Sequence, residues 1–400
     1  MSAALLEVTT VAAYIAARED LAALVDVATL EVAEVGDGNL NLVFIATDAR
    51  GRSLVLKQSL PYVRMVGDSW PLSQDRILYE ARGYEAADRV SPESIPAYYG
   101  LDAERRIIVM EDLSAWTVWR RALDEGRRAP GAAAAIGRYV ARLAFGTSVF
   151  GLDPDAVKRA RTLDENPDLR RITEDWWFVH PYTENEFASW HPGVADDVLS
   201  LREGGLLDEI AALKFRFTTG AEALVHGDLH TGSIFVRGDA QGVQEGAQPA
   251  KAFDIEFAFY GPVGFDLGTL FGNLLLAQVR AAVLERDAGF RAWLDGLITE
   301  TWDAFVAELT ALWPGRVDAS YTDAFLGRWL AQTWTDAVGY AGAEAIRRIV
   351  GGAKVSDIQS LDEPAHVRAV RAALRIARRA VEERPASPQA LSALVAEELP

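Results

Sequence analysis

The sequence predicts an α+β fold with two lobes: a small β-rich N-terminal lobe over 1–110 and a large helical C-terminal lobe over 116–400, joined by a hinge at 111–115. Short segments rich in β-formers and separated by turn residues fill the first lobe. Ala- and Arg-rich segments with helical spacing dominate the second lobe. The length of 400 residues agrees with two units, since a domain usually has roughly 100–200 residues.

The N-terminal lobe begins with a predicted amphipathic helix whose N-terminal cap is expected at Thr9 or Thr10. Three strands follow, over 27–35, 42–47 and 53–58, and the tight turns between them predict an antiparallel meander. The rest of the lobe is a helix over about 72–89 and two strands over 97–101 and 106–110.

The helical lobe contains one β-like island, over 223–256, which holds three short strands. Within it, the segment 238–251 has Gly, Gln and Pro but no periodicity, which predicts a surface loop. Two prolines at 385–388 predict a break before a last short helix.

Composition excludes several classes of function. The net charge of −18 repels phosphate backbones and anionic lipid, so we expect neither nucleic acid nor a membrane as a partner. The chain has no Cys, which excludes disulfides, Cys-ligated metals and thiol catalysis and agrees with a cytoplasmic location. The first twenty residues lack the basic region of a signal peptide, and the apolar run 267–279 is too short to cross a bilayer.

The most informative motif is a tight polar loop between two predicted strands, over 225–235. Asp228 stands there between His226 and His230, and glycines frame the loop. An isolated Asp in a turn more often caps its own backbone, so the alternative is an ordinary hairpin. We interpret the two His as braces that hold the loop through hydrogen bonds, not as groups that titrate during turnover.

A second motif follows the next predicted strand, where Asp254 and Glu256 are two positions apart. Carboxylates with this spacing at the end of a strand can both reach one Mg²⁺ ion, which takes oxygen ligands and substrate phosphates. A carboxylate base such as Asp228 beside a metal-binding pair is what phosphoryl transfer requires. Taken alone, such a pair is more often a solvated strand end.

Lys57 is the only Lys in the first 150 residues and lies on a predicted strand. It is either an edge-strand charge or a phosphate-binding Lys positioned by a helix carboxylate, for which Glu80 is the first candidate and Glu85 the second. The preceding turn, Gly36-Asp37-Gly38-Asn39, could cover phosphates with its backbone N–H groups. The order of these features, with a hinge at 110–113 that offers backbone groups to adenine, is that of a kinase-type nucleotide site.

The loop HGDLHTGSIF, at 226–235, closely resembles the catalytic loop of the aminoglycoside- and choline-kinase-like small-molecule kinases, whose usual form is HGD-x-H-x-x-N. Ser233 stands where that pattern has Asn, and in this the chain looks like the methylthioribose kinase branch, which carries HGDLHTGS. Ile255, where the family usually has Pro, and the long 238–251 segment depart from the pattern. Five further segments are similar to that branch: GDGNLNLVF (36–44), LKQSLPYVRMVGDSWPLS (56–73), MEDLS (110–114), DIEFAFYGPVGFDLG (254–268) and DAVGYAGAEAIRRIVGGAKVSD (336–357).

The resemblance implies a bilobal protein-kinase-like fold and transfer of the ATP γ-phosphoryl group to the 1-hydroxyl of methylthioribose, in methionine salvage. Asp228 would orient the sugar hydroxyl and accept its proton. Asp254 and Glu256, with Ser233, would hold Mg²⁺. The resemblance also implies a homodimer. The ATP-binding residues that it implies are Asn39, Lys57, Glu111, Asp112, Leu113, Asp254, Ile255 and Glu256.

Arg347 and Arg348 look like an arginine pair of the family that holds the sugar and neutralises transition-state charge. From the residues alone, adjacent positions cannot share one helix face, so we expect one Arg to pair with a carboxylate such as Glu344 and the other to bind an anion. The resemblance suggests that Trp70 belongs to a loop that closes on the active site. The aromatic cluster 176–182 is interpreted as core or dimer surface, with a sugar platform as the alternative.

Three other functions compete with this interpretation. A kinase of another small hydroxylated metabolite, such as a different sugar, choline or an aminoglycoside, would share the nucleotide site. A catalytically inactive nucleotide-binding regulator is disfavoured because Lys57, Asp228, Asp254 and Glu256 are all present. A protein kinase is disfavoured because no activation segment or A-P-E-like anchor follows Asp254.

Overall fold

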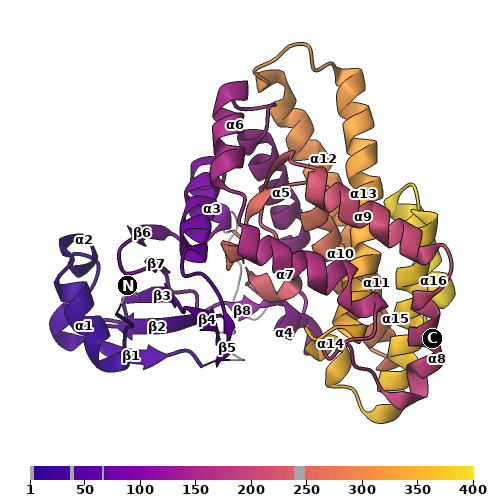
Figure 1. Ribbon diagram of the computed structural model, residues 1–400, viewed down its shortest axis with the longest axis horizontal. Helices are drawn as coiled ribbons and strands as arrows, with labels where there is room; N and C mark the ends of the chain where they lie inside the picture. Colours follow the sequence, from indigo (N-terminus) through magenta and orange to yellow (C-terminus); the bar gives the residue numbers. More distant parts are fainter. Residues whose placement is uncertain (1–3, 37–39, 65–66, 238–247) are drawn as a thin grey trace.

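The computed structural model describes residues 4–36, 40–64, 67–237 and 248–400 and confirms the two-lobed α+β architecture. Figure 1 shows a small lobe built on a sheet beside a larger lobe of packed helices. Within the described residues, no helix is long and apolar enough to cross a membrane.

The small lobe is an antiparallel five-stranded sheet in the order β1-β2-β3-β7-β6. One face of this sheet is covered by α1 through buried apolar side chains such as Val11, Ile15, Leu54 and Leu56. The other face turns toward α3, which stands between the sheet and the helical lobe (Figure 1). The elements of this lobe are α1 (Val8–Ala16), α2 (Glu19–Ala22), β1 (Glu31–Glu34), β2 (Asn41–Thr47), β3 (Ser53–Ser59), β4 (Tyr62–Val63), β5 (Gly67–Pro71), α3 (Arg76–Val90), β6 (Tyr98–Asp102) and β7 (Ile107–Glu111).

Two predicted helix starts were wrong. The first helix begins at Val8 because Glu7 is its N-cap: the Glu7 N–H donates to Thr10 Oγ1 at 2.9 Å, so Thr10 completes the cap from inside the helix. The α3 helix begins at Arg76, later than expected, because β4 and β5 form a hairpin that ends at Pro71. The Leu72 N–H then donates to the Pro61 carbonyl, which keeps this segment outside the helix.

The strand predicted over 27–35 is also shorter than expected. Asp26 accepts the Ala28 N–H, and this side-chain cap starts a 3₁₀ turn over Val27–Thr29 before β1 begins at Glu31. At the predicted hinge, β7 ends at Glu111, and Asp112 accepts the Ser114 N–H at 2.8 Å in the turn that follows.

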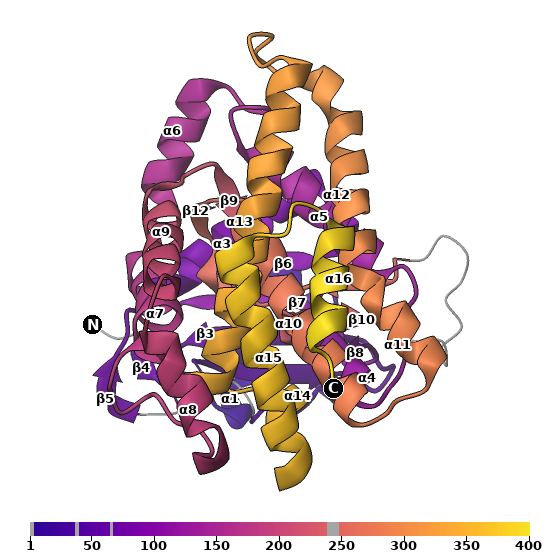
Figure 2. The same cartoon turned by 90° about the vertical axis from the view of Figure 1, so that its right-hand side faces the viewer.

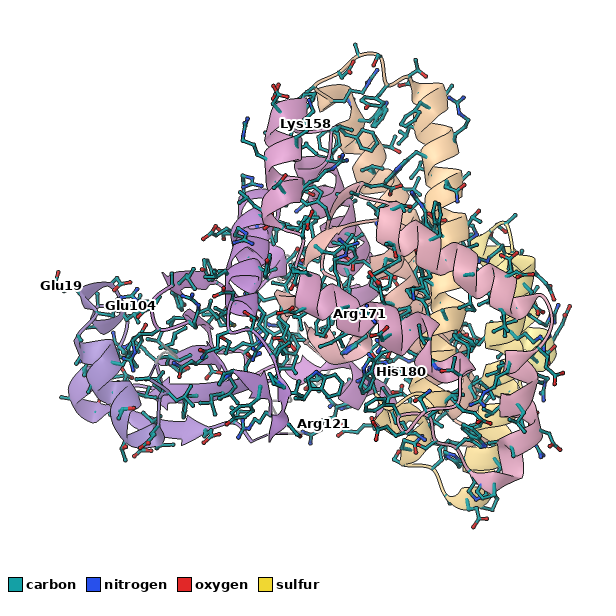
Figure 3. All side chains as sticks on the ribbon, viewed as in Figure 1. Glu19, Glu104, Arg121, Lys158, Arg171 and His180 are labelled. Carbon is teal, nitrogen blue, oxygen red and sulfur yellow. The ribbon has the colours of Figure 1, made fainter. Side chains whose placement is uncertain are left out.

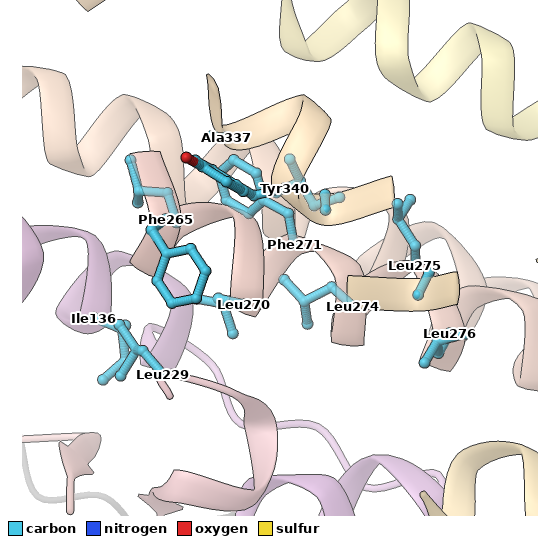
Figure 4. Close-up of a cluster of buried hydrophobic side chains, with 14 of the residues drawn as sticks. Ile136, Leu229, Phe265, Leu270, Phe271, Leu274, Leu275, Leu276, Ala337 and Tyr340 are labelled. Carbon is cyan, nitrogen blue, oxygen red and sulfur yellow. The ribbon is translucent and has the colours of Figure 1, made fainter. Parts of the chain in front are cut away.

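The core of the helical lobe is the packing of α10 against α13, with α5 on α12 and α15 on α13 beside it (Figure 2). Figure 4 shows Phe265 and Phe271 of α10 beside Ala337 and Tyr340 of α13, with Leu270 on the opposite side of α10. The helices of this lobe are α4 (Trp119–Asp124), α5 (Ala132–Thr147), α6 (Pro154–Leu163), α7 (Pro167–Phe178), α8 (Ala195–Leu199), α9 (Leu206–Thr219), α10 (Gly264–Val283), α11 (Ala288–Asp295), α12 (Leu297–Leu312), α13 (Asp323–Val350), α14 (Ser356–Gln359), α15 (Glu363–Glu383) and α16 (Pro388–Glu398).

Two small antiparallel sheets form the β island, in the orders β11-β10-β8 and β12-β9. Part of the predicted loop 238–251 is therefore strand, since residues 250 and 251 belong to β11; residues 238–247 lie outside the described part of the chain. The last helix, α16, follows the predicted break. The strands of the island are β8 (Thr117–Val118), β9 (Ala223–Val225), β10 (Ile234–Val236), β11 (Ala250–Ala252) and β12 (Phe259–Gly261).

Candidate active site

The polar loop that carries Asp228 connects β9 to β10. Gly227 has φ +82° at its start, and a Cβ there would lie 2.1 Å from the Phe257 carbonyl oxygen, so only Gly fits. The carboxylate of Asp266, buried at the start of α10, accepts the backbone N–H groups of His226 at 2.7 Å and Gly227 at 2.9 Å. Asp266 thus anchors the loop, a role that the sequence interpretation missed.

Both histidines brace the loop, as predicted. His230 Nδ1 accepts the Gly232 N–H at 3.0 Å, so its proton is on Nε2, which lies 3.3 Å from Asp228 Oδ2. His226 Nε2 lies 3.0 Å from the Phe253 carbonyl and joins the loop to the strand before Asp254. Burial lowers the pKa of His230 to about 4, so this ring is neutral at physiological pH.

Asp228 faces the arginine pair of α13. Its Oδ1 lies 3.2 Å from Arg347 Nη2 and 3.6 Å from Arg348 Nη2. Both arginines also contact Glu344: Arg347 Nε donates to Oε2, and Arg348 Nε donates to Oε1 at 2.7 Å. The prediction that only one Arg pairs with Glu344 was therefore wrong, because residues three and four positions ahead both lie beside Glu344 on the helix.

Asp228 is ionised in this setting. Its burial acts to raise the pKa, but His230 and the two arginines outweigh that effect and hold the pKa well below its usual range. A carboxylate with such a pKa is a hydrogen-bond acceptor at any physiological pH. It is suited to orienting a hydroxyl group more than to storing a proton.

On the N-lobe side, Lys57 lies in the middle of β3. Leu54 and Leu56 belong to the core beneath α1, and because side chains alternate along a strand, Lys57 points to the opposite face. There its Nζ lies 2.9 Å from Glu80 Oε1 on α3, which confirms Glu80, not Glu85, as the partner of Lys57.

Asp254 and Glu256 meet the same ammonium group. Lys57 Nζ contacts Asp254 Oδ1 and lies 3.6 Å from Glu256 Oε2. Asp254 has left-handed backbone, φ 65°, and its N–H donates to the Tyr84 hydroxyl at 3.0 Å. Glu256 Oε2 also accepts from Asn41 Nδ2 at 2.6 Å. The two carboxylates predicted to hold a metal therefore converge on Lys57.

Acidic groups outnumber basic groups in this cluster. Lys57 and the buried Arg76 face three carboxylates, those of Glu80, Asp254 and Glu256. Burial, opposed by Lys57 and reinforced by Glu256, raises the pKa of Glu80 to about 8. Burial by itself lowers the pKa of Lys57, but the three carboxylates raise it well above its usual value, so the ammonium stays charged.

This donor set fits Mg²⁺. The ion is usually held by one or two carboxylates together with substrate phosphates, and Asp254 and Glu256 offer two carboxylates at one point. The Asp254 side chain is 43% exposed and open to a ligand, whereas that of Glu256 is only 6% exposed. Over the described residues, no cluster of three or more His, Asp or Glu side chains is arranged to hold a metal ion.

The other residues predicted to bind ATP or metal lie in different settings. Ser233 is buried, and its Oγ lies 3.2 Å from His230 Nδ1, so the structure places this hydroxyl within the catalytic loop. Ile255 is buried; a Cβ added at Gly83 of α3 would lie 3.1 Å from its side chain. Asn39 lies outside the described residues.

At the hinge, two side chains are already engaged. Glu111 Oε2 accepts from Lys251 Nζ at 2.6 Å, and Asp112 Oδ2 accepts from Ser53 Oγ at 2.8 Å. Leu113 is buried. Any contribution of these residues to adenine binding therefore rests on their backbone groups.

Trp70, on β5, contacts aromatic rings of the helical lobe. Its ring centroid lies 5.8 Å from that of Phe187 and 6.4 Å from that of Trp176 on α7. His180, labelled in Figure 3, stacks on Phe187 at 4.9 Å and completes this group. We call Trp70, Trp176, His180 and Phe187 the aromatic box.

The remaining aromatic residues of the predicted cluster are core, as expected. Trp177, Phe178 and Tyr182 are buried. Trp177 has a second contact, because the Arg347 guanidinium lies over its ring at 4.5 Å. Trp177 thus supports Arg347, and its neighbour on α7, Trp176, belongs to the aromatic box.

Comparison with known proteins shows the family of the chain. Residues 31–305 match the family model described as APH, phosphotransferase enzyme family. The chain is 42% identical over 338 residues to the methylthioribose kinase of Yersinia pseudotuberculosis serotype O:3 (strain YPIII), covering 82% of this chain and 81% of the relative. It is 40% identical over 356 residues to the methylthioribose kinase of Geobacillus kaustophilus (strain HTA426), covering 88% and 86%. A solved choline/ethanolamine kinase family protein from Mesorhizobium loti matches with a TM-score of 0.43 at 15% identity, over 97% of this chain and 98% of that chain.

Proposed function

The chain belongs to the phosphotransferase enzyme family, in its methylthioribose kinase branch, and is a small-molecule kinase; on this premise we propose that it transfers the γ-phosphoryl group of ATP to the 1-hydroxyl of S-methyl-5-thioribose. The product is S-methyl-5-thioribose 1-phosphate, an intermediate of methionine salvage. The observation that carries the proposal is the arginine pair on Asp228, which gives the acceptor side of the site positive charge.

On the nucleotide side, Lys57 contacts the ATP phosphates while Glu80 holds its ammonium in place. Asp254 and Glu256 hold Mg²⁺, and their convergence on Lys57 brings these groups to one point. Mg²⁺, when bound, neutralises charge on the phosphate oxygens. The backbone at 111–113 binds the adenine.

On the acceptor side, Asp228 accepts a hydrogen bond from the 1-hydroxyl and takes its proton as the bond to phosphorus forms. Phosphoryl transfer passes through a loose transition state, so little base strength is needed before the leaving group departs. This suits a carboxylate whose pKa lies well below the usual range. Positioning of the hydroxyl is the main contribution of Asp228.

Arg347 and Arg348 hold the sugar and stabilise the charge that develops on the transferred group. Guanidinium groups bind phosphate oxygens in a fixed planar geometry, which makes two of them a specific anion site. The same pair disfavours an aminoglycoside, because a polycationic acceptor needs carboxylates around it. Trp70, in the aromatic box, closes over the bound sugar.

One assay tests this function. Purified protein with Mg²⁺ and ATP is offered methylthioribose, ribose, choline and a panel of aminoglycosides, and ADP release is followed. We expect turnover on methylthioribose with a much higher kcat/KM than on the other acceptors, and a phosphorus NMR spectrum of a sugar 1-phosphate. Turnover on another acceptor but not on methylthioribose would overturn the proposal.

A further inference from the structure

A buried carboxylate beneath the arginine pair has no place in the reaction described so far. Glu344 lies on α13, one turn before Arg347 and Arg348, and its side chain is 0% exposed. A buried carboxylate is costly unless it is fully paired. Burial raises the pKa of Glu344, but the two arginines outweigh this and lower it, so the group is ionised.

The hydrogen bonds of Glu344 join it to the two arginines and to Asn273. Oε2 accepts from Arg347 Nε, while Oε1 accepts from Arg348 Nε at 2.7 Å and from Asn273 Nδ2 at 2.8 Å. The carboxylate therefore occupies the Nε edge of both guanidinium groups. Their Nη2 atoms are left pointing toward Asp228, at 3.2 Å and 3.6 Å.

The two Nη2 atoms differ in how they are engaged: that of Arg347 donates to Asp228, whereas that of Arg348 only faces it. The Nη2 of Arg348 is buried and has no hydrogen-bond partner within the described residues. Arg347 is held more completely, since its guanidinium face also lies on Trp177 at 4.5 Å. With its Nε fixed by Glu344 and its Nη2 making no hydrogen bond, the Arg348 guanidinium is preorganised to donate to an anionic oxygen beside Asp228.

Asn273, which donates to Glu344, is itself held by further polar contacts. Asn273 Oδ1 accepts from Arg120 Nη2 at 2.6 Å, and Arg120 Nε lies 3.2 Å from Asp357 Oδ2. Arg120 also borders the catalytic loop, because a Cβ at Gly232 would lie 2.6 Å from its Nη1. Hydrogen bonds thus join Arg120 through Asn273 and Glu344 to the arginine pair, and Arg120 itself lies against Gly232 of the catalytic loop.

We infer that Glu344, supported by Asn273, is a positioning residue that orients Arg347 and Arg348 toward the transferred phosphoryl group. The inference rests on the proposed function of the arginine pair. A positioning role also explains why residue 344 is an acid. A Gln there would have one acceptor oxygen for three donors, and its own NH₂ group would face one of those donors.

The test is a double-mutant cycle of Glu344→Gln and Arg348→Gln, with kcat and both KM values measured on folded, monodisperse protein. We expect each single variant to lower kcat by about 100-fold and to leave the KM for ATP within about twofold, as for loss of one preorganised donor. Because Glu344 acts through the arginines, the double variant is expected to lose little more than the worse single variant.

A matched control is Glu308→Gln, which removes a carboxylate from Arg142 (2.7 Å) on the α12–α5 contact of the same lobe. Its kcat is expected to stay within about twofold of the wild-type value, as for a partly exposed ion pair remote from the chemistry. Two results would overturn the inference: a kcat of Glu344→Gln that matches this control, or losses that multiply in the double variant.

If Glu344→Gln does not fold, Asn273→Leu replaces it in the cycle, because this change removes the bonds to Glu344 and Arg120 at similar volume. A kcat about tenfold lower is expected, coupled to Arg348→Gln in the same way, and an unchanged kcat would overturn the inference. Turnover of the wild-type protein on methylthioribose tests the proposed function separately. The double-mutant cycle is measured with whichever acceptor the wild-type protein phosphorylates.

Discussion

Arg347 and Asp228 are 119 positions apart in the chain, yet Arg347 Nη2 lies 3.2 Å from Asp228 Oδ1. This contact joins the end of α13 to the loop between β9 and β10. It means that the carboxylate expected to receive the acceptor hydroxyl is already paired with a cation before any ligand binds. A sugar hydroxyl must therefore share or replace an existing interaction, and changes in α13 are transmitted directly to Asp228.

We predict that Asp228→Asn lowers kcat by several orders of magnitude and leaves ATP affinity nearly unchanged. The amide keeps the shape of the side chain but loses the negative charge and one acceptor, so it can neither take the hydroxyl proton nor balance the arginine pair. Kinetics on methylthioribose and calorimetric titration with ATP measure the two quantities. Near-native kcat in the variant would show that Asp228 is not the acceptor of the proton.

The contacts of Lys57 with Glu80, Asp254 and Glu256 could be anticipated from the order of motifs. Lys57 on a strand and Glu80 on the next helix meet because a central strand and the helix that covers it are adjacent in this kind of lobe. Asp254 and Glu256 were assigned from the spacing of two carboxylates after a strand. In each case, local periodicity fixes which way a side chain points, and little long-range information is needed.

The acceptor side was less predictable because it depends on contacts between distant helices. Arg347 and Arg348 were assigned different roles on the assumption that neighbours point apart, but long side chains at i+3 and i+4 both reach Glu344. Asp266 and Asn273, which hold the catalytic loop and Glu344, lie in an apolar helix that looks like plain core in the sequence. Their partners are known only once α10 is packed against α13 and the loop.

We predict that Asp254→Asn lowers kcat and raises the Mg²⁺ concentration needed for half-maximal activity at least tenfold. Asp254 has left-handed backbone, φ 65°, a conformation that Asn also tolerates, so the change removes charge without straining the loop. The measurement is activity against free Mg²⁺ at saturating ATP. An unchanged Mg²⁺ dependence would exclude Asp254 as a ligand of the ion.

Trp70→Ala is predicted to raise the KM for the sugar by about tenfold while the KM for ATP changes little, as expected when an aromatic contact that orders a loop is lost. Trp70 contacts Trp176 and Phe187 across the lobes, so its removal weakens closure on the acceptor side. Trp190, a partly buried Trp of the helical lobe that contacts Arg202, provides the control Trp190→Ala. Equal effects of both changes on the sugar KM would argue against a role of Trp70 in closure.

Gly227→Ala is predicted to destabilise the protein by more than about 2 kcal/mol, because a left-handed residue acquires a Cβ that overlaps a backbone oxygen. That Cβ would lie 2.1 Å from the Phe257 carbonyl oxygen, and φ at Gly227 is +82°. Gly327, exposed within α13 with nothing within 4 Å of an added Cβ, is the control. Gly327→Ala is expected to stabilise by about 0.5–1 kcal/mol, since Ala is the better helix former. Denaturant unfolding measures both changes, and a Gly227→Ala variant of wild-type stability would contradict the clash.

The pH dependence of stability is predicted to report on Asp357, which supports Arg120 below the acceptor site. Its carboxylate is fully buried, and burial, opposed by Arg120 and reinforced by Asp124, raises its pKa from 3.8 to about 6, with Arg280 lowering it slightly. Between these two values the folded state binds the proton more tightly than the unfolded state. Asp357 therefore contributes stability below about pH 4, and that contribution is lost as pH rises through 6.

Asp357→Asn removes this titration. The free energy of unfolding of the variant, relative to wild type, is therefore expected to increase as pH rises from 5 to 7.5, by on the order of 1–2 kcal/mol. The buried His230, whose pKa is lowered to about 4, titrates in the opposite sense, but it is present in both proteins and cancels in the difference. Denaturant unfolding at four pH values measures this difference. A difference that is flat, or that falls with pH, would mean that Asp357 is ionised in the folded state throughout this range and that Arg120 compensates its burial completely.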